Sequence, residues 1–328
     1  MRSHDSRVHR SLITRRGILI LVALAGLICG IEISQPIARL RGMTVPLGHG
    51  LNAVTVSTGS GRSILSLIEH YDDNQLTDDL PKDPDQYAAL LNATGAADRV
   101  LDQPVRTGLM VSKLPPMSPL AKTGLRAKDV VVPKGTNEFT SGESMRQVLV
   151  AGGDVVVYRG RSTKYDLRIP PGVFGEDVSA TAVSSVAPPS GERIPVALAD
   201  SVGGSSGLAL ALRMIDSRTK GSLVGDGHIV VTGALDSSGG VVGVGEVPTK
   251  HATAGFSGAK FMLVPTDNRS EVVGLRGVPV EMVSSVDDAI GVLCSYTLGQ
   301  NAPNGDGVCS TPRIRYAQSV REAALARY

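Results

Sequence analysis

Short apolar runs typical of strands alternate with helix-like segments in the second half of the chain, and this alternation constrains the fold most. The expected strands are IPVALAD (194–200), HIVVTGAL (228–235), AKFMLVP (259–265) and VPVEMV (278–283). The expected helices lie over 208–215, from about Lys250, and over 286–293. Strands that alternate with helices predict an α/β or α+β domain, which we place at residues 170–296.

A strand-rich segment at residues 105–169 precedes this domain. Alternating apolar residues predict strands, residues 144–150 predict a short helix, and the final stretch predicts a pair of strands around the Arg159–Gly160 turn. The stretch SPLAKTGLRAKDVVV (118–132) resembles the PDZ domains of bacterial envelope proteases, in which an AGL-like turn precedes a strand opening with Asp, here Asp129. The resemblance implies a module that adds an extended peptide along the strand edge after Gly108–Leu109.

The N-terminus carries a membrane-targeting pattern. Five Arg and one Asp stand in the first sixteen residues, and residues 17–31, GILILVALAGLICGI, carry no charge. This run fits a signal-peptide core, and it is long enough for a membrane span if it extends to Ala38. Both interpretations stay open, but no small-x-small cleavage site follows, which favours an uncleaved signal anchor over 17–38. The arginines predict a cytoplasmic segment at 1–16 and an extracytoplasmic location for the remaining domains in either case.

Composition and charge exclude several classes of partner. Lys and Arg number 33 against 31 Asp and Glu, a net charge of +2, which does not suggest a nucleic-acid-binding groove. The acidic run DDNQLTDDLPKDPD (72–85) is interpreted as a solvated loop, because it lacks the glycine and terminal Glu of a calcium-binding loop. We therefore expect no nucleic-acid partner, no metal and no cofactor.

The remaining segments and the cysteines complete the predicted organisation. Residues 39–104 are assigned to a juxtamembrane region, and residues 297–328 to a C-terminal tail that ends in a helix. Cys29 lies in the apolar run and is not interpreted as a lipid-attachment site, because Ile28 precedes it. Cys294 and Cys309 either form a disulfide, as an extracytoplasmic location permits, or Cys294 is only a small buried residue.

The stretch GGSSG (203–207) lies between a predicted strand and a predicted helix. Its simplest interpretation is structural, because glycine permits a sharp turn and serine is a good helix cap. The G-x-S-x-G spacing centred on Ser205 also matches the nucleophile elbow of an esterase. An esterase of that fold needs a histidine much further along the chain, and only His228 and His251 follow. The esterase is therefore kept as a minor alternative.

A serine can also be activated by a neutral lysine, when burial lowers the lysine pKa from about 10.4 to about 7–8. Four ordered motifs resemble the Lon proteases, in particular the membrane-anchored Lon-like proteases that carry a PDZ domain and no ATPase. VGGSSG aligns Ser205 with the nucleophile, VVTGAL aligns Thr232 with the family's threonine, and GEVPTK aligns Lys250 with the dyad lysine. AKFMLVPTDN closes the pattern.

This resemblance implies an α+β chain with a signal anchor, a PDZ-like β-rich domain and a Lon-protease-like α/β proteolytic domain. It implies an ATP-independent serine endopeptidase of the cell membrane that cleaves unfolded or terminal protein segments outside the cytoplasm. Lys250 would act as base for Ser205, Thr232 would orient the lysine, and N–H groups around Gly204 and Ser206 would bind the oxyanion. A ring-like homo-oligomer is also implied.

Three departures from the family motif define the alternatives. Gly204 replaces Pro and Ser206 replaces Ala, which raises the question of which serine attacks, and the register from Gly207 favours Ser205. Glu246 replaces the second Gly before the lysine, and its carboxylate could hold Lys250 charged. The main alternative is therefore a non-catalytic, membrane-tethered scaffold whose PDZ-like module binds peptides.

Overall fold

The computed structural model describes residues 42–48, 51–56, 76–135, 142–174, 178–199, 201–219, 223, 228–298 and 307–325. The predicted cytoplasmic segment at 1–16, the predicted anchor at 17–38 and Cys29 lie outside these residues. Among the helices of the described ranges, none has the length and apolar character needed to cross a membrane.

The structure is mixed α/β and agrees with the predicted α+β class. A first five-stranded sheet has the order β1-β2-β10-β13-β14. Its strands are β1 (Gly42–Gly48), β2 (Leu51–Val56), β10 (Ile229–Val231), β13 (Phe261–Pro265) and β14 (Val280–Val283). β1 and β2 form an antiparallel hairpin, whereas β2, β10, β13 and β14 run parallel. The strands expected at 259–265 and 278–283 are confirmed by β13 and β14. The one expected at 228–235 is only partly correct, because β10 ends at Val231 and Ala234–Leu235 pairs in a separate two-stranded sheet.

Helices cover both faces of this first sheet. They are α4 (Pro84–Val100), α7 (Gly207–Arg218), α8 (Val247–Phe256) and α10 (Val286–Leu298). Because side chains alternate along a strand, Ile229 and Val231 join the core under α4, α7 and α10. Val230 points the other way, into the core that contains Val247 and Ala254 of α8. The sheet is therefore the middle layer of a three-layer unit.

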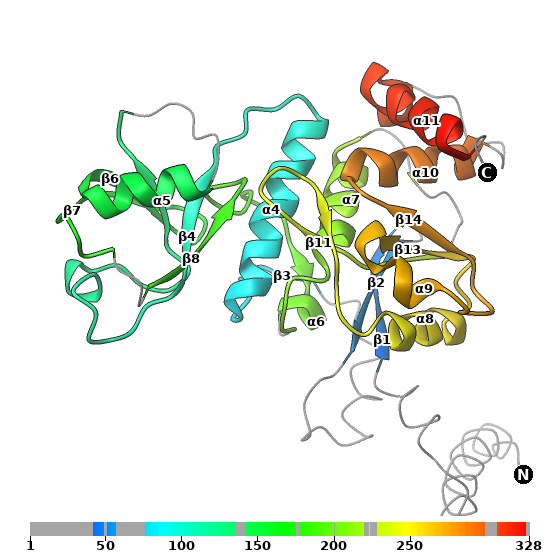
Figure 1. The fold of residues 1–328 in the computed structure, drawn as a ribbon, viewed down its shortest axis with the longest axis horizontal. Coiled ribbons are helices and arrows are strands. Elements are labelled where there is room, and N and C mark those ends of the chain that lie inside the picture. Colours follow the sequence, from blue (N-terminus) through cyan, green and yellow to red (C-terminus); the bar gives the residue numbers. More distant parts are fainter. Residues whose placement is uncertain are drawn as a thin grey trace, which may run out of the picture.

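A second five-stranded sheet, antiparallel throughout, forms the module on the left of Figure 1. Its order is β7-β6-β5-β4-β8, with β4 (Gly108–Lys113), β5 (Val130–Pro133), β6 (Gly153–Arg159), β7 (Thr163–Ile169) and β8 (Ser179–Val183). Helix α5 (Gly142–Ala151) contributes Met145 and Leu149 to its core. Asp129, buried just before β5, binds Arg159 at 2.6 Å and fixes the turn between β6 and β7.

Two features of this module differ from the sequence-based prediction. β4 was expected to offer a free edge after Gly108–Leu109, but β5 and β8 pair with it on both sides, so this expectation is wrong. The edge strands of this sheet are β7 and β8, and β8 is the one that pairs with β4. Since β8 lies beyond Ile169, the sheet also continues past the predicted module boundary, across the turn at Pro170–Pro171.

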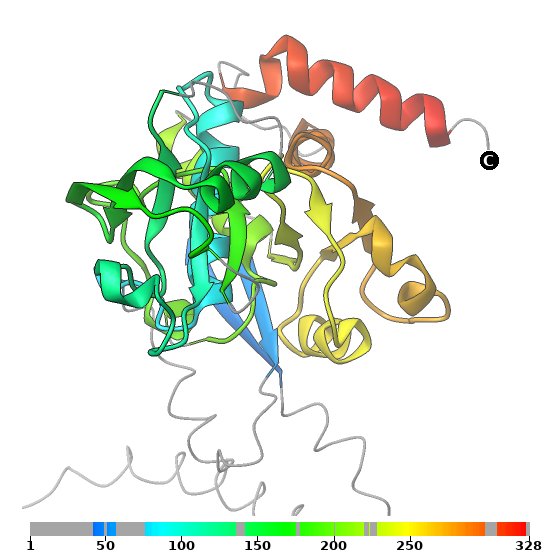
Figure 2. The same cartoon turned by 60° about the vertical axis from the view of Figure 1, so that its left-hand side comes forward.

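Helix α4 lies between the two sheets and belongs to the segment assigned to a juxtamembrane region (Figures 1 and 2). One side of α4 joins α7 in the core of the first unit through Leu90, Ala93 and Ala97. The other side packs Tyr87 and Leu91 against the module's sheet. The hairpin β1–β2 also lies in this segment and extends the first sheet. Residues 42–56 and 84–100 are therefore structural parts of the unit that contains α7 and α8.

Several short elements connect these layers. They are β3 (Leu76–Thr77), β9 (Ile194–Pro195), β11 (Ala234–Leu235), β12 (Val241–Val242), α6 (Val196–Ala199), α9 (Arg269–Val272) and the 3-10 turns Ala121–Thr123, Thr266–Asn268 and Val308–Ser310. The expected strand at 194–200 is wrong beyond Pro195, because the chain turns into α6 and the Ser201 N–H bonds the Leu198 carbonyl. The acidic run at 72–85 enters α4 at Pro84, where Asp83 caps the helix.

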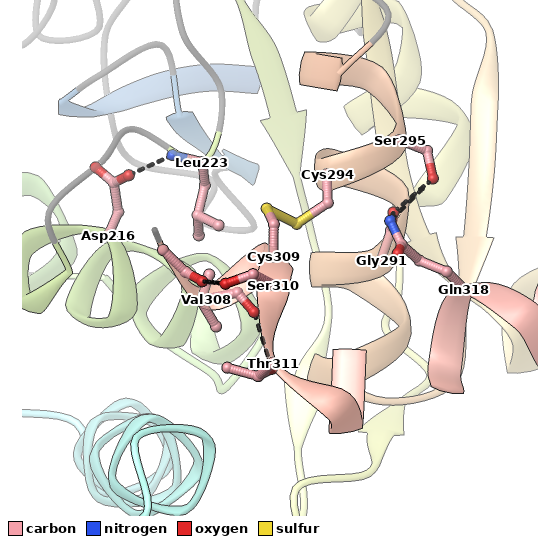
Figure 3. The surroundings of a disulfide bond; sticks show 11 residues. Asp216, Leu223, Gly291, Cys294, Ser295, Val308, Cys309, Ser310, Thr311 and Gln318 are labelled. Atoms are coloured by element: carbon pink, nitrogen blue, oxygen red, sulfur yellow. Dashed lines mark hydrogen bonds between the residues drawn. A yellow bond between two sulfur atoms is a disulfide. The ribbon is translucent and has the colours of Figure 1, made fainter. Parts of the chain in front are cut away.

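A disulfide between Cys294 and Cys309 holds the C-terminal segment against α10 (Figure 3). The disulfide answers the question, left open by the sequence, of whether Cys294 is paired or only buried. The expected terminal helix, α11 (Pro312–Leu325), follows Cys309 in the chain. Closing a loop of this length contributes about 3 kcal/mol to stability. The tail is thus structurally part of the first unit.

Candidate functional site

The two serines of GGSSG lie in a tight loop that opens helix α7. Residues 201–206, called the serine loop below, turn at Gly203, whose φ of +82° is a left-handed conformation that favours glycine. Ser206 is the N-cap residue of α7 and is buried, whereas Ser205 is only partly buried. Because the apolar residues of α7 fill the main core, the helix holds the loop in a fixed position. Of the two serines, Ser205 is the accessible one.

Thr232 joins the serine loop to the end of strand β10. The Ser205 carbonyl accepts a hydrogen bond of 2.9 Å from the Gly233 N–H and one of 3.4 Å from the Thr232 hydroxyl. Thr232 is itself 0% exposed, and its N–H bonds the carbonyl of Leu263 on β13. The sheet therefore fixes the position of Ser205 through the two residues that follow β10.

Lys250 reaches this same threonine from helix α8. Its Nζ donates a hydrogen bond of 3.2 Å to Thr232 Oγ1, and the residue is only 4% exposed. Burial lowers the pKa of Lys250 from 10.5 to about 8, even though Glu246 and Glu271 attract its charge. At pH 7 about a tenth of this amine is therefore unprotonated and able to accept a proton, far more than for a lysine in water.

Glu246, whose carboxylate was the basis for the alternative of a charged Lys250, is exposed at the start of α8. It has a left-handed φ of 61°, and its carboxylate accepts a bond of 3.1 Å from Thr249 Oγ1. In the described part of the chain no ion pair joins Glu246 to Lys250. The carboxylate raises the pKa of Lys250 less than burial lowers it.

The structure thus brings Ser205, Thr232 and Lys250 together from three separate elements, across 45 positions of sequence. A chain of contacts runs from the Lys250 amine to the Thr232 hydroxyl and on to the Ser205 carbonyl. Among the described residues, the Ser205 hydroxyl forms no hydrogen bond, and the backbone N–H groups of Ser205 and Ser206 donate none. These donors stand at the positive end of α7, close to Gly204, and are available to an anionic oxygen.

Two residues of the site were not predicted from the sequence. Asp83 Oδ1 accepts the Gly203 N–H at 3.0 Å, and Gln86 Nε2 donates to Ser206 Oγ at 2.6 Å. Both stand at the start of α4, where the acidic run that was interpreted as a surface loop ends. The signal that could have found them is Asp83-Pro84, an N-cap residue followed by proline at the first helical position.

The two later histidines contact other parts of the unit. His228 Nε2 lies 3.1 Å from Ser257 Oγ, and His251 Nε2 donates to the Val278 carbonyl at 2.8 Å. The group that the fold brings to the contact network of Ser205 is therefore Lys250. Models of known protein families do not match this chain, and no curated protein matches its sequence.

Proposed function

We propose that the chain is an ATP-independent serine endopeptidase of the Lon-like type, with Ser205 as nucleophile and Lys250 as general base. The observation that carries the proposal is the buried Lys250 amine, with its pKa lowered to about 8 and its hydrogen bond to Thr232. A surface lysine would be fully protonated near neutral pH and could not accept a proton from serine.

The proposed reaction requires the Lys250 amine, which bonds Thr232, to reach the Ser205 hydroxyl, with which it forms no hydrogen bond in the described structure. The neutral Lys250 amine accepts the proton of the Ser205 hydroxyl as its oxygen attacks the carbonyl carbon of a peptide bond. The C–N bond of the tetrahedral intermediate then breaks, and the lysine ammonium returns the proton to the departing amine. Water attacks the resulting ester with Lys250 again as base, which releases the acid and restores Ser205. The N–H groups of Ser205 and Ser206 would stabilise the oxyanion.

Substrates are proposed to be unfolded segments, loops or termini of proteins. The sequence contains no G-x-x-x-x-G-K-[ST] motif, so ATP-driven unfolding does not enter the proposal. The module would present such segments by adding them as a strand to β8, whose outer edge is unpaired within the described sheet. Anchoring in the cell membrane through 17–38 and assembly into a homo-oligomer are also proposed, on the resemblance alone.

The test is the cleavage of unfolded casein by the full chain, together with labelling by a serine-reactive fluorophosphonate. We expect Ser205→Ala and Lys250→Ala to abolish cleavage, and Ser206→Ala to retain it at a reduced rate. Activity should rise with pH through about 8, because deprotonation produces the base form of Lys250. Cleavage and labelling that survive Ser205→Ala but not Ser206→Ala would assign the nucleophile to Ser206.

A second candidate function is a non-catalytic scaffold that binds peptides through the module. Among the described strands β8 pairs only with β4, and this open edge favours the scaffold independently of the serine loop. Ser179 and Thr181 on β8 are exposed. A chain that binds terminal peptides but neither cleaves casein nor reacts with the fluorophosphonate would support this candidate. Such a result would reject the peptidase.

A further inference from the structure

The start of helix α4 is bonded to the serine loop by a single carboxylate. Asp83 Oδ1 accepts the N–H of Gln86 at 2.9 Å, which caps the helix, and also the N–H of Gly203 at 3.0 Å. Because one oxygen makes both bonds, the serine loop cannot move without disturbing the first turn of α4. The helix end therefore fixes the position at which the loop turns.

Gln86 makes the second contact, and its environment is unusual for an amide. It is 0% exposed, its Nε2 bonds Ser206 Oγ at 2.6 Å, and its Oε1 has no hydrogen-bond partner among the described residues. Burying an amide oxygen without a partner is unfavourable. An apolar side chain of the same length would fill this space without that cost, so packing alone does not account for a glutamine here.

We propose that Asp83 and Gln86 are positioning residues for the serine loop, an inference that rests on the proposed function. Gln86 holds the Ser206 hydroxyl in the interior and leaves Ser205 as the accessible serine. Asp83 fixes the backbone at Gly203, so that the N–H groups of Ser205 and Ser206, which donate to no described residue, keep one orientation. Both act through the geometry of the loop.

The test compares Gln86→Met, which keeps the length of the side chain and removes its hydrogen bond, with Thr94→Val as matched control. Thr94 is a buried polar residue of the same helix, about two turns beyond Gln86. Its hydroxyl bonds Leu90 O and lies 3.8 Å from Met214 Sδ of α7, and among the described residues it makes no hydrogen bond to the serine loop. We expect Gln86→Met to lower kcat about 10- to 100-fold with little change in KM, the loss that a small displacement of a reacting group produces. Thr94→Val should leave both parameters unchanged.

Ser206→Ala removes the partner of the same hydrogen bond. The double variant with Gln86→Met should therefore lose no more activity than the more affected single variant. Losses that multiply would show that Gln86 acts elsewhere and would overturn the proposal, as would a Gln86→Met enzyme with unchanged kcat.

Hydrogen exchange over residues 199–212 tests the positioning role without relying on activity. Faster exchange of this segment in Gln86→Met than in Thr94→Val supports the role, and equal exchange in the two variants overturns it. The wild type could neither cleave casein nor react with the fluorophosphonate while Gln86→Met still exchanges faster than Thr94→Val. This combination would reject the peptidase and leave the loop contact established. The failures of the two proposals are thus distinguishable.

Discussion

At the scale of single residues, Lys250 is held in a place that suits a base and does not suit an ion. Lys250 as a residue is only 4% exposed, so burial costs its ammonium group hydration, and Thr232 offers one hydroxyl oxygen in exchange. The exposed Glu246 is too weakly coupled to restore the loss, so the pKa falls to about 8. Burying Lys250 at this position therefore lowers the free energy of unfolding at pH values up to about 8, where the amine begins to act as a base.

We expect Lys250→Met to stabilise the fold near pH 7 and to lose this advantage at higher pH. The folded amine has a pKa of about 8 and the unfolded one 10.5, so between these values the unfolded chain binds more protons and wild-type stability rises with pH. Below this window the buried ammonium costs about 3 kcal/mol, at 1.36 kcal/mol per pKa unit. Urea unfolding of both proteins at pH 7 and pH 10 measures the difference.

The exposed Lys122 provides the control for this comparison. Lys122→Met replaces a lysine on the surface, and its effect at each pH is subtracted from that of Lys250→Met. If Lys250→Met changes the free energy of unfolding by the same amount at pH 7 and pH 10, the pKa of Lys250 is not lowered. The main support for the Ser205–Lys250 dyad would then be lost.

At the scale of elements, α4 connects the candidate site to the module. Asn92 is buried and bonds in both directions, since its Nδ2 donates to Leu235 O on β11 and its Oδ1 accepts the Ser184 N–H just after β8. Gly95 lets the helix approach Ser184 closely, because a Cβ at this position would lie 2.3 Å from the Ser184 oxygen. The close contact between α4 and the module thus depends on glycine at position 95, which has no side chain.

Gly95→Ala is therefore expected to destabilise the protein by about 1–3 kcal/mol, the usual cost of overpacking, although alanine is the better helix former. The matched control is Gly255→Ala in α8, where a Cβ would meet its nearest atom at 3.6 Å. This control should be neutral or stabilising by up to about 1 kcal/mol. Thermal unfolding of both variants gives the comparison, and equal effects would mean that α4 and the module can separate freely.

The sequence predicts the local elements of the site better than their assembly. The apolar runs of β10 and α7 form local patterns from which their types can be inferred, whereas the strand expected before the serine loop is helix α6 beyond Pro195. Helix α4 has no such pattern. It is buried on nearly all sides and carries Gln86, Asn92 and Thr94 inside, which hides its apolar face. Its bonds to residues more than 90 positions away are not visible in local periodicity.

Across the molecule, the three-layer unit is discontinuous in sequence. Residues 42–56 supply β1 and β2, residues 84–100 supply α4, and the remaining elements follow from 194 onward. The strand-rich module, with β4 to β8, lies between α4 and β9 in the chain and beside α4 in space (Figures 1 and 2). The site therefore depends on chain segments from both sides of the module, because Asp83 and Gln86 precede it and Ser205 and Lys250 follow it.

This arrangement predicts that residues 170–328 will not fold alone, although they contain Ser205, Thr232 and Lys250. Without β2 the backbone edge of β10 is unpaired, and without α4 the apolar side of α7 is open to water. We expect this fragment to lack a cooperative thermal transition by circular dichroism, whereas residues 42–328 unfold cooperatively. A chain in which a short Gly-Ser linker replaces residues 108–183 retains β1, β2 and α4. It should unfold cooperatively at a lower temperature, since Tyr87 and Leu91 lose their cover. If the 170–328 fragment instead unfolds as sharply as 42–328, the N-terminal strands and α4 are dispensable additions, and the positioning role of α4 loses its structural basis.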